Sequence, residues 1–185
     1  MIVATAGLHV LIFQATDIEL GKPLLHRQSC MKMQTRCVAA FPEGHGFAMG
    51  SVEGKVSFEY IEEAADKKRF VFKCHREKKP NANPEGVQEQ IVNPVNTISF
   101  HPKYGTFATG GCDGVVNIWD GMNQKRIFAL PKYPTSIAAV AFNHEGNLLA
   151  VASSYTFERG HEQHPPDQIY IRAVVDAEVR PKTRV

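Results

Sequence analysis

Residues 94–120 read PVNTISFHPKYGTFATGGCDGVVNIWD, and they carry the clearest structural signal in the chain. Short runs of β-branched and aromatic residues alternate there with turn residues, as is typical of short strands joined by tight turns. Asp113-Gly114 lies between two apolar runs and favours a hairpin, because both turn positions need a positive φ. The predicted strands are Val95–Phe100, Thr106–Gly110, Val115–Trp119 and, just beyond the stretch, Arg126–Leu130.

The same pattern occurs 60 residues earlier in the chain. Phe47–Val56 aligns with Phe107–Val116, so that aromatic, Ala, Gly, acidic and Val positions coincide. A third copy is predicted from Ile137 to Ser153, and Ile2–Phe13 resembles the second half of a fourth copy. A unit of about 40 residues with four strands and a terminal Trp-Asp matches a propeller blade. The predicted class is therefore all-β, a β-propeller with about three and a half blades, and no amphipathic stretch supports a helical solenoid.

The predicted organisation is one propeller domain with two interruptions. Its parts are a partial blade over 1–30, blades over 31–80, 94–132 and 133–175, a loop over 81–93 and a C-terminal tail over 176–185. Pro and Gly make Glu77–Asn93 and Thr156–Gln168 exposed connectors. Glu62–Arg69 is the only helix-prone segment, and a polar surface loop explains it equally well.

Composition narrows the class of protein further. The 185 residues are 43% apolar and 22% charged, a composition that excludes low-complexity disorder. The net charge of +2 is too small to indicate a nucleic-acid partner. No run of 18 apolar residues offers a membrane span, and the N-terminus lacks the features of a secretory signal. The four cysteines form no close pair, which favours a reduced, intracellular protein.

No catalytic or metal-binding constellation emerges from the sequence. Cys74-His75 is not a nucleophile–base pair, because adjacent strand residues point to opposite sides. Ser153-Ser154 lacks the G-x-S-x-G context of a nucleophile. His161 and His164 have no further ligands to complete a zinc site. Trp119 and Asp120 are assigned structural roles, in sheet packing and in capping a turn. We therefore predict no enzyme activity, no metal and no cofactor.

Three basic residues form the candidate site. Arg36 precedes the first strand of its blade, Lys55 follows a turn and Arg76 follows the fourth strand, so all three are predicted at one end of the blade. Converging cations suit a carboxylate or a phosphate, and Arg favours bidentate contact. A set of solvated surface charges fits the spacing equally well. Lys32 and Tyr133 are predicted on the same side and extend this candidate surface.

Several stretches resemble one family. MQTRCVAAFP (33–42), GSVEGKVSFEY (50–60), FKCHR (72–76), residues 94–120, YPTSIAAVAF (133–142) and DAEVRPK (176–182) resemble the Bub-type mitotic checkpoint WD-repeat family. Its relative, the mRNA-export propeller of the nuclear pore, shares the QTRC and FKCHR motifs. NIWD and YPTSIA look more like the checkpoint branch, whereas RGHE (159–162) and FNHEGN (142–147) look more like the export branch.

The resemblance implies a seven-bladed WD-repeat ring of roughly 300 residues, at about 40–45 residues a blade. The chain is then expected to be the C-terminal half of such a ring, as a fragment or a truncated gene model. A natural short form that pairs with another half-ring is the alternative. A half-ring would expose two unpaired sheet edges, which invite association.

The resemblance also implies a function. It points to a non-enzymatic scaffold of the spindle assembly checkpoint, located in the nucleus, at kinetochores and in the cytoplasm. The implied partners are GLEBS-type segments of checkpoint kinases and phosphorylated MELT-type repeats of the kinetochore scaffold, held by Arg36, Lys55 and Arg76. Lys55 stands where relatives often have Arg, which weakens the case for bidentate contact there. Membrane, nucleic acid and ubiquitin are not expected partners. The alternative is a nuclear-pore mRNA-export adaptor that binds a nucleoporin GLEBS segment.

Overall fold

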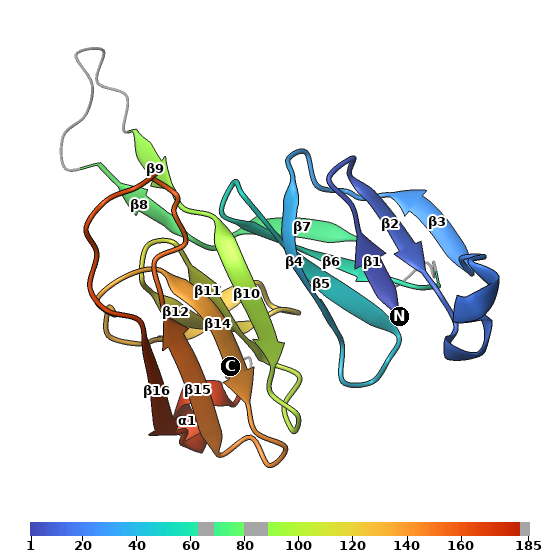
Figure 1. The fold of residues 1–185 in the computed structure, drawn as a ribbon. Helices are drawn as coiled ribbons and strands as arrows, with labels where there is room; N and C mark the ends of the chain where they lie inside the picture. The colour runs from blue at the N-terminus through green and yellow to red at the C-terminus, as the bar shows by residue number, and fades with distance from the viewer. Residues whose placement is uncertain (63–68, 80–88, 182–185) are drawn as a thin grey trace.

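A computed structural model describes residues 1–62, 69–79 and 89–181, and nearly all of its regular structure is antiparallel β-sheet (Figure 1). The first sheet contains β1 (Ile2–Ala4), β2 (His9–Ile12) and β3 (Leu25–Gln28). The second contains β4 (Thr35–Ala40), β5 (Gly46–Ser51), β6 (Lys55–Tyr60) and β7 (Phe70–Lys73). Strands β10 (Val95–Phe100), β11 (Phe107–Gly111), β12 (Val116–Asp120) and β13 (Lys125–Ala129) form another sheet, and β14 (Ile137–Phe142), β15 (Leu148–Ser153) and β16 (Gln168–Ala173) form the last.

The all-β prediction is confirmed, and the four strands predicted around residues 94–120 lie within one residue of the observed ones. The last sheet differs from the expected four-stranded unit, because β14, β15 and β16 are its three strands in the described part of the chain. Its connection between β15 and β16 is the irregular segment around Thr156–Gln168 that was predicted as a connector.

The connector predicted over Glu77–Asn93 contains regular structure at both ends. Strands β8 (Arg76–Lys78) and β9 (Gln90–Val92) pair antiparallel and project from the molecule as a hairpin (Figure 1). The predicted loop over 81–93 is therefore wrong for its last residues. The Pro and Gly content that suggested a loop falls in 80–88, outside the described residues, as do 63–68 of the segment considered helix-prone.

Neighbouring sheets stack through their first strands, with β10 lying against both β4 and β14. The core between the second sheet and the β10–β13 sheet is rich in aromatic rings. Phe107 is fully buried, with its centroid 5.3 Å from that of Phe58, and Trp119 packs edge-on against Phe72. Gly110 allows the close approach of the next sheet, because a Cβ at this position would lie 2.4 Å from Ile137 Cγ2.

The described part of the chain contains two short helices, and both lie outside the sheets. A 3-10 helix (Ala15–Leu20) connects β2 to β3, and α1 (Asp176–Val179) follows β16 within the predicted tail. Val179 is buried, and its carbonyl accepts a hydrogen bond from Thr106 Oγ1 at 2.7 Å, which fixes the tail beneath the β10–β13 sheet. Among residues 1–62, 69–79 and 89–181, no helix has the length and hydropathy needed to cross a bilayer.

Candidate functional site

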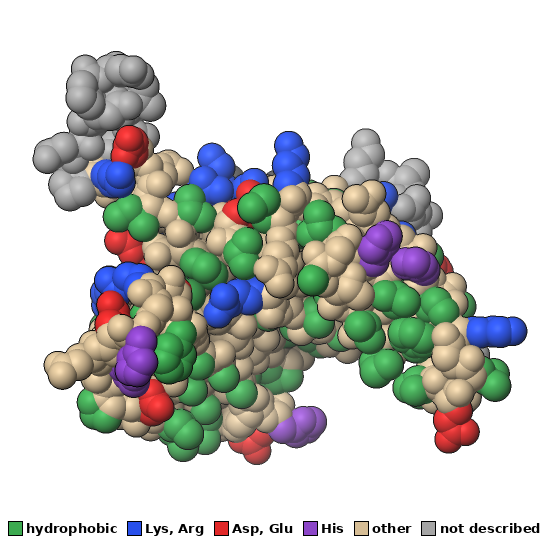
Figure 2. All heavy atoms as spheres, turned by 45° about the horizontal axis from the view of Figure 1, so that its top comes forward, with side chains coloured by type: hydrophobic (Ala, Val, Ile, Leu, Met, Phe, Trp, Pro, Cys, Tyr) green, Lys and Arg blue, Asp and Glu red, His purple; other side chains and the backbone are tan. Residues whose placement is uncertain are grey.

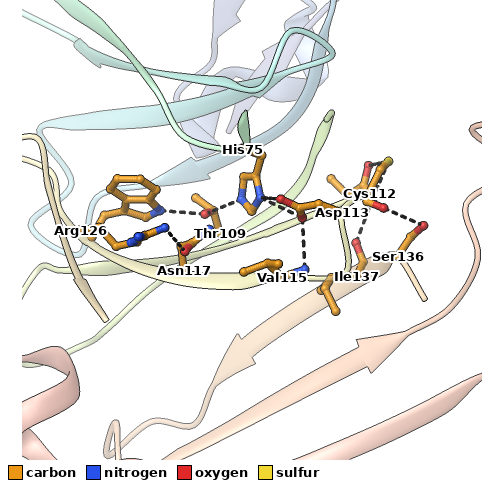
Figure 3. Close-up of polar contacts among 11 residues, drawn as sticks. His75, Thr109, Cys112, Asp113, Val115, Asn117, Arg126, Ser136 and Ile137 are labelled. Carbon is orange, nitrogen blue, oxygen red and sulfur yellow. Dashed lines mark hydrogen bonds and ion pairs between the residues drawn. The ribbon is translucent and has the colours of Figure 1, made fainter. Parts of the chain in front are cut away.

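A buried polar network joins the second sheet to the β10–β13 sheet (Figure 3). His75 Nδ1 lies 2.9 Å from Asp113 Oδ2, and its Nε2 lies 2.8 Å from Thr109 Oγ1. Trp119 Nε1 donates to the same Thr109 oxygen at 2.8 Å. A carboxylate only accepts hydrogen bonds and an indole N–H only donates. The network is therefore satisfied with a proton on His75 Nδ1 and the Thr109 hydroxyl donating to Nε2.

This network has a structural role and offers no accessible chemistry. His75 is 1% exposed and Trp119 6% exposed, so neither side chain can contact a substrate. Trp119 was correctly assigned to sheet packing, and Asp120 accepts from Asn123 N at 3.1 Å as a turn cap. The sequence pattern indicates a turn at Asp113 but not its bond to His75, and His75 is not predicted as a structural residue. The signal that could have found them is the spacing between His75, which follows the last strand of one repeat, and Thr109, Asp113 and Trp119 in the next repeat.

The predicted basic residues do lie at one end of the second sheet. Thr35 at the start of β4 pairs with Ser51 at the end of β5, and Lys55 at the start of β6 pairs with Lys73 at the end of β7. Arg36 and Lys55 therefore emerge beside the β5–β6 turn. Figure 2, in which the top of Figure 1 comes forward, shows Lys and Arg side chains gathered along the face that carries the β8–β9 hairpin.

Arg76 is held at the same end of the second sheet because the chain just before it packs closely against Gly54. Gly54 has a φ of 63°, and its carbonyl accepts a hydrogen bond from Cys74 N at 2.8 Å. A Cβ at Gly54 would lie 2.6 Å from the His75 carbonyl oxygen, so only glycine lets the base of the hairpin pack so closely. Arg76, at the start of β8, is thereby held next to the turn that contains Glu53.

Glu53 contacts two of the three predicted cations. Its Oε2 lies 2.6 Å from Lys55 Nζ, and its carbonyl oxygen accepts from Arg76 Nη2 at 3.2 Å. Arg76 Nη1 also donates to Gln90 Oε1 at 3.4 Å. Arg36 is exposed and has no polar partner among the described residues. The site therefore combines one unpaired guanidinium with two cations that an internal acidic residue already engages.

Lys32 and Tyr133 lie at the periphery of this site. Lys32 is exposed in the segment before β4. Tyr133 N donates to the Gly114 carbonyl at 2.9 Å, which places it at the corresponding turn of the β10–β13 sheet, and burial raises the pKa of its phenol. Tyr133 also lines a cleft of about 570 Å³ together with Val92, Ser136 and Glu158.

The cleft wall beside Tyr133 carries a fixed negative charge. Burial alone would raise the pKa of Glu158, but hydrogen bonds from Ser136 and Thr156 outweigh that effect and hold its pKa below the usual value. In the described part of the chain, no three His, Cys, Asp or Glu side chains are grouped so that they could hold a metal ion. The candidate residues at this end of the second sheet are therefore the cations Arg36, Lys55 and Arg76, and their charges are of the sign that attracts anionic groups.

Known proteins provide an independent comparison. The family described as WD domain, G-beta repeat matches residues 88–120. The chain is 51% identical to "Mitotic checkpoint protein BUB3.1" of Arabidopsis thaliana, over 100% of this chain and 52% of that protein. It is 47% identical to "Mitotic checkpoint protein bub3" of Dictyostelium discoideum, over 97% of this chain and 52% of that protein. It is 37% identical to "mRNA export factor GLE2" of Chaetomium thermophilum, over 85% of this chain and 43% of that protein.

The chain thus spans about half the length of these relatives. Identity to the two checkpoint proteins exceeds identity to the export factor, as the NIWD and YPTSIA motifs predicted. The repeat match and the antiparallel sheets agree with a partial WD-repeat β-propeller. Over the half of these relatives that it spans, the chain is similar throughout to mitotic checkpoint proteins of the Bub type, and its sheets and its WD repeat agree with that similarity.

Proposed function

We propose that this chain is part of a non-enzymatic scaffold of the spindle assembly checkpoint that binds acidic or phosphorylated peptide segments. The observation that carries the proposal is the position of Arg36, Lys55 and Arg76 at one end of the second sheet. Guanidinium and ammonium groups on a rigid sheet bind carboxylates and phosphates with little loss of conformational entropy. The sequence identity of 51% and 47% to mitotic checkpoint proteins supports a role in the checkpoint.

The proposed partners are of two kinds. Phosphorylated MELT-type repeats would bind at the cluster on the second sheet, with Lys32 and Tyr133 extending the surface. GLEBS-type segments of checkpoint kinases would bind across several blades. Because the chain spans about half the length of its relatives, we expect GLEBS binding by this chain alone to be weak or absent. The proposed locations are the nucleus, kinetochores and the cytoplasm.

A charge reversal tests the phosphopeptide role directly. Arg76→Glu should abolish binding of a phosphothreonine MELT-type peptide in a fluorescence anisotropy titration, because it replaces a donor with a repelling charge. Lys125→Glu is the matched control, since exposed Lys125 lies at the opposite end of its sheet and undergoes the same change of charge. Equal affinity of the wild type and Arg76→Glu would exclude the role of Arg76.

The second candidate function is mRNA export, favoured by the similarity to the export factor. It requires RNA contact through the same basic face, which a steep fall of RNA affinity with salt concentration would reveal. The net charge of +2 gives little support to such contact. RNA binding without phosphopeptide binding would favour this alternative over the checkpoint role.

A further inference from the structure

Glu53 is an acidic residue placed inside a cluster of basic ones. Its carboxylate and its backbone carbonyl engage Lys55 and Arg76 respectively, at 2.6 Å and 3.2 Å. The side chains of Lys55 and Glu53 are 22% and 18% exposed, so this ion pair is largely shielded from solvent and is screened less by salt than a surface pair.

The cluster is also incompletely satisfied. Glu53 Oε1 and Arg76 Nε are both buried, and neither has a hydrogen-bond partner among residues 1–62, 69–79 and 89–181. A buried polar atom without a partner is costly, so the arrangement around Glu53 and Arg76 is not the most stable one their chemistry permits. An arriving anion that draws Arg76 outward would give its Nε an acceptor and expose the Glu53 carboxylate to water.

We propose that Glu53 is a resident counter-anion that weakens anion binding at this site. This inference rests on the proposed function of the cluster, and it concerns the regulation of its affinity. In the free protein, Glu53 neutralises the charge of Lys55. A phosphate or carboxylate that binds to Lys55 must therefore compete with Glu53 and is repelled by its negative charge. Coulomb repulsion scales with the charge of the ligand, so a phosphate dianion is opposed more strongly than a carboxylate.

A counter-anion at the position of Glu53 would make the cluster more selective among acidic ligands. Without it, Arg36, Lys55 and Arg76 would present three uncompensated cations at one end of the sheet and would bind acidic segments of many kinds. With it, the net charge of the cluster is reduced by one. Binding then requires a ligand whose remaining contacts offset the cost of displacing Glu53, which restricts the site to peptides that also fit the surrounding surface.

Removing the charge of Glu53 tests the proposal. Wild type and Glu53→Gln would be titrated with inorganic phosphate, with a phosphothreonine peptide and with the same peptide carrying Glu in place of phosphothreonine. We expect Glu53→Gln to bind the phosphopeptide about tenfold more tightly and the Glu peptide about threefold more tightly. Glu43→Gln is the matched control, because exposed Glu43 lies in the β4–β5 turn at the opposite end of the same sheet. Its affinities should equal those of the wild type.

The outcomes separate this inference from the proposed function. Equal phosphopeptide affinity of wild type and Glu53→Gln overturns the inference and leaves the proposed function standing. Absence of phosphopeptide binding in both proteins, with a gain of inorganic phosphate binding in Glu53→Gln, overturns the proposed function and supports the inference. Should Gln disturb the turn, Glu53→Ser makes the same charge change with a residue that turns accept. If neither variant folds by circular dichroism, Glu53 is a structural residue and the proposal is wrong.

Discussion

His75 Nδ1 lies 2.9 Å from Asp113 Oδ2, although His75 follows the second sheet and Asp113 belongs to the β11–β12 turn of the next sheet. Both side chains are nearly inaccessible to solvent. The pair therefore fastens one sheet to the next at a point where the chain crosses between them, and it positions His75 for its contact with Thr109.

Removal of one member of this pair should be strongly destabilising. Asp113→Ala leaves His75 Nδ1 buried without an acceptor, and we expect a loss of about 3 kcal/mol in the free energy of unfolding. Urea denaturation followed by Trp119 fluorescence measures this loss. Glu43→Ala, which removes an exposed carboxylate, should change the stability by less than about 0.5 kcal/mol. A similar effect of both substitutions would contradict the role given to the His75–Asp113 pair.

Because Gly110 lies in close contact with the next sheet, a larger side chain at this position should lower the stability of the protein. Gly110→Ala places a Cβ 2.4 Å from Ile137 Cγ2 and 2.8 Å from Thr97 Cγ2, so β14 must move away from β10. We expect the free energy of unfolding to fall by about 1–3 kcal/mol. Gly7→Ala serves as the control, because its Cβ would meet its nearest neighbour at an ordinary 3.5 Å. Equal urea midpoints for the two variants would show that the sheets separate without cost.

His101 predicts a loss of stability in mild acid. Burial lowers its pKa below the ordinary value of 6.5, and its Nδ1 accepts hydrogen bonds from the backbone N–H groups of Lys103 and Tyr104. Lys103 also lowers its pKa, whereas Asp176 and the Gly146 carbonyl raise it. The unfolded chain therefore binds a proton more readily than the folded protein, and stability falls as the pH drops below about 6.5.

The thermal midpoint at pH 7.5 and 5.5 checks this expectation for His101. His101→Asn keeps an acceptor for the two N–H groups but removes the titrating ring, so its midpoint should depend less on pH than that of the wild type. His144→Asn, in an exposed position, should retain the dependence of the wild type. An unchanged dependence in His101→Asn would assign the acid sensitivity to other groups.

The thiol of Cys37 should be unreactive in the folded protein. Burial raises its pKa to about 12, so the thiolate that attacks alkylating reagents is scarce at pH 8. We expect iodoacetamide to label Cys37 at least about a hundredfold more slowly than in the urea-unfolded chain, as measured by mass spectrometry of the peptides. Rapid labelling of the native protein would show that β4 opens from the sheet.

Local pattern predicted the strands well because each lies between strong turn signals. Val95–Phe100 is a strand, and the strands on either side of Asp113-Gly114 pair antiparallel as predicted. The expectation of a positive φ at both turn residues was wrong for Asp113, because Gly114 alone of the two adopts it, with a φ of 74°. The β8–β9 hairpin could not be predicted in the same way. Its strands have only three residues each and are largely exposed, so they carry no apolar alternation to reveal them.

The sequence predicts where the three cations of the candidate site lie on the sheet, but not which residues they contact. Alternating turns place Arg36 and Lys55 at one end of a sheet, and this requires only the strand order. The contact between Arg76 and Glu53 depends on the hairpin packing against Gly54, which is a tertiary effect.

The origin of His75 bears on how such proteins can be recombined. The repeat match at residues 88–120 contains Thr109, Asp113 and Trp119 but begins after His75. A blade transplanted with its boundary at Pro94 would carry three members of the network and would depend on its new host for the imidazole. A graft that starts upstream of Cys74 would include His75 and therefore the whole network. The segment to transfer thus begins before the first strand of the β10–β13 sheet, because it must include the end of the preceding repeat.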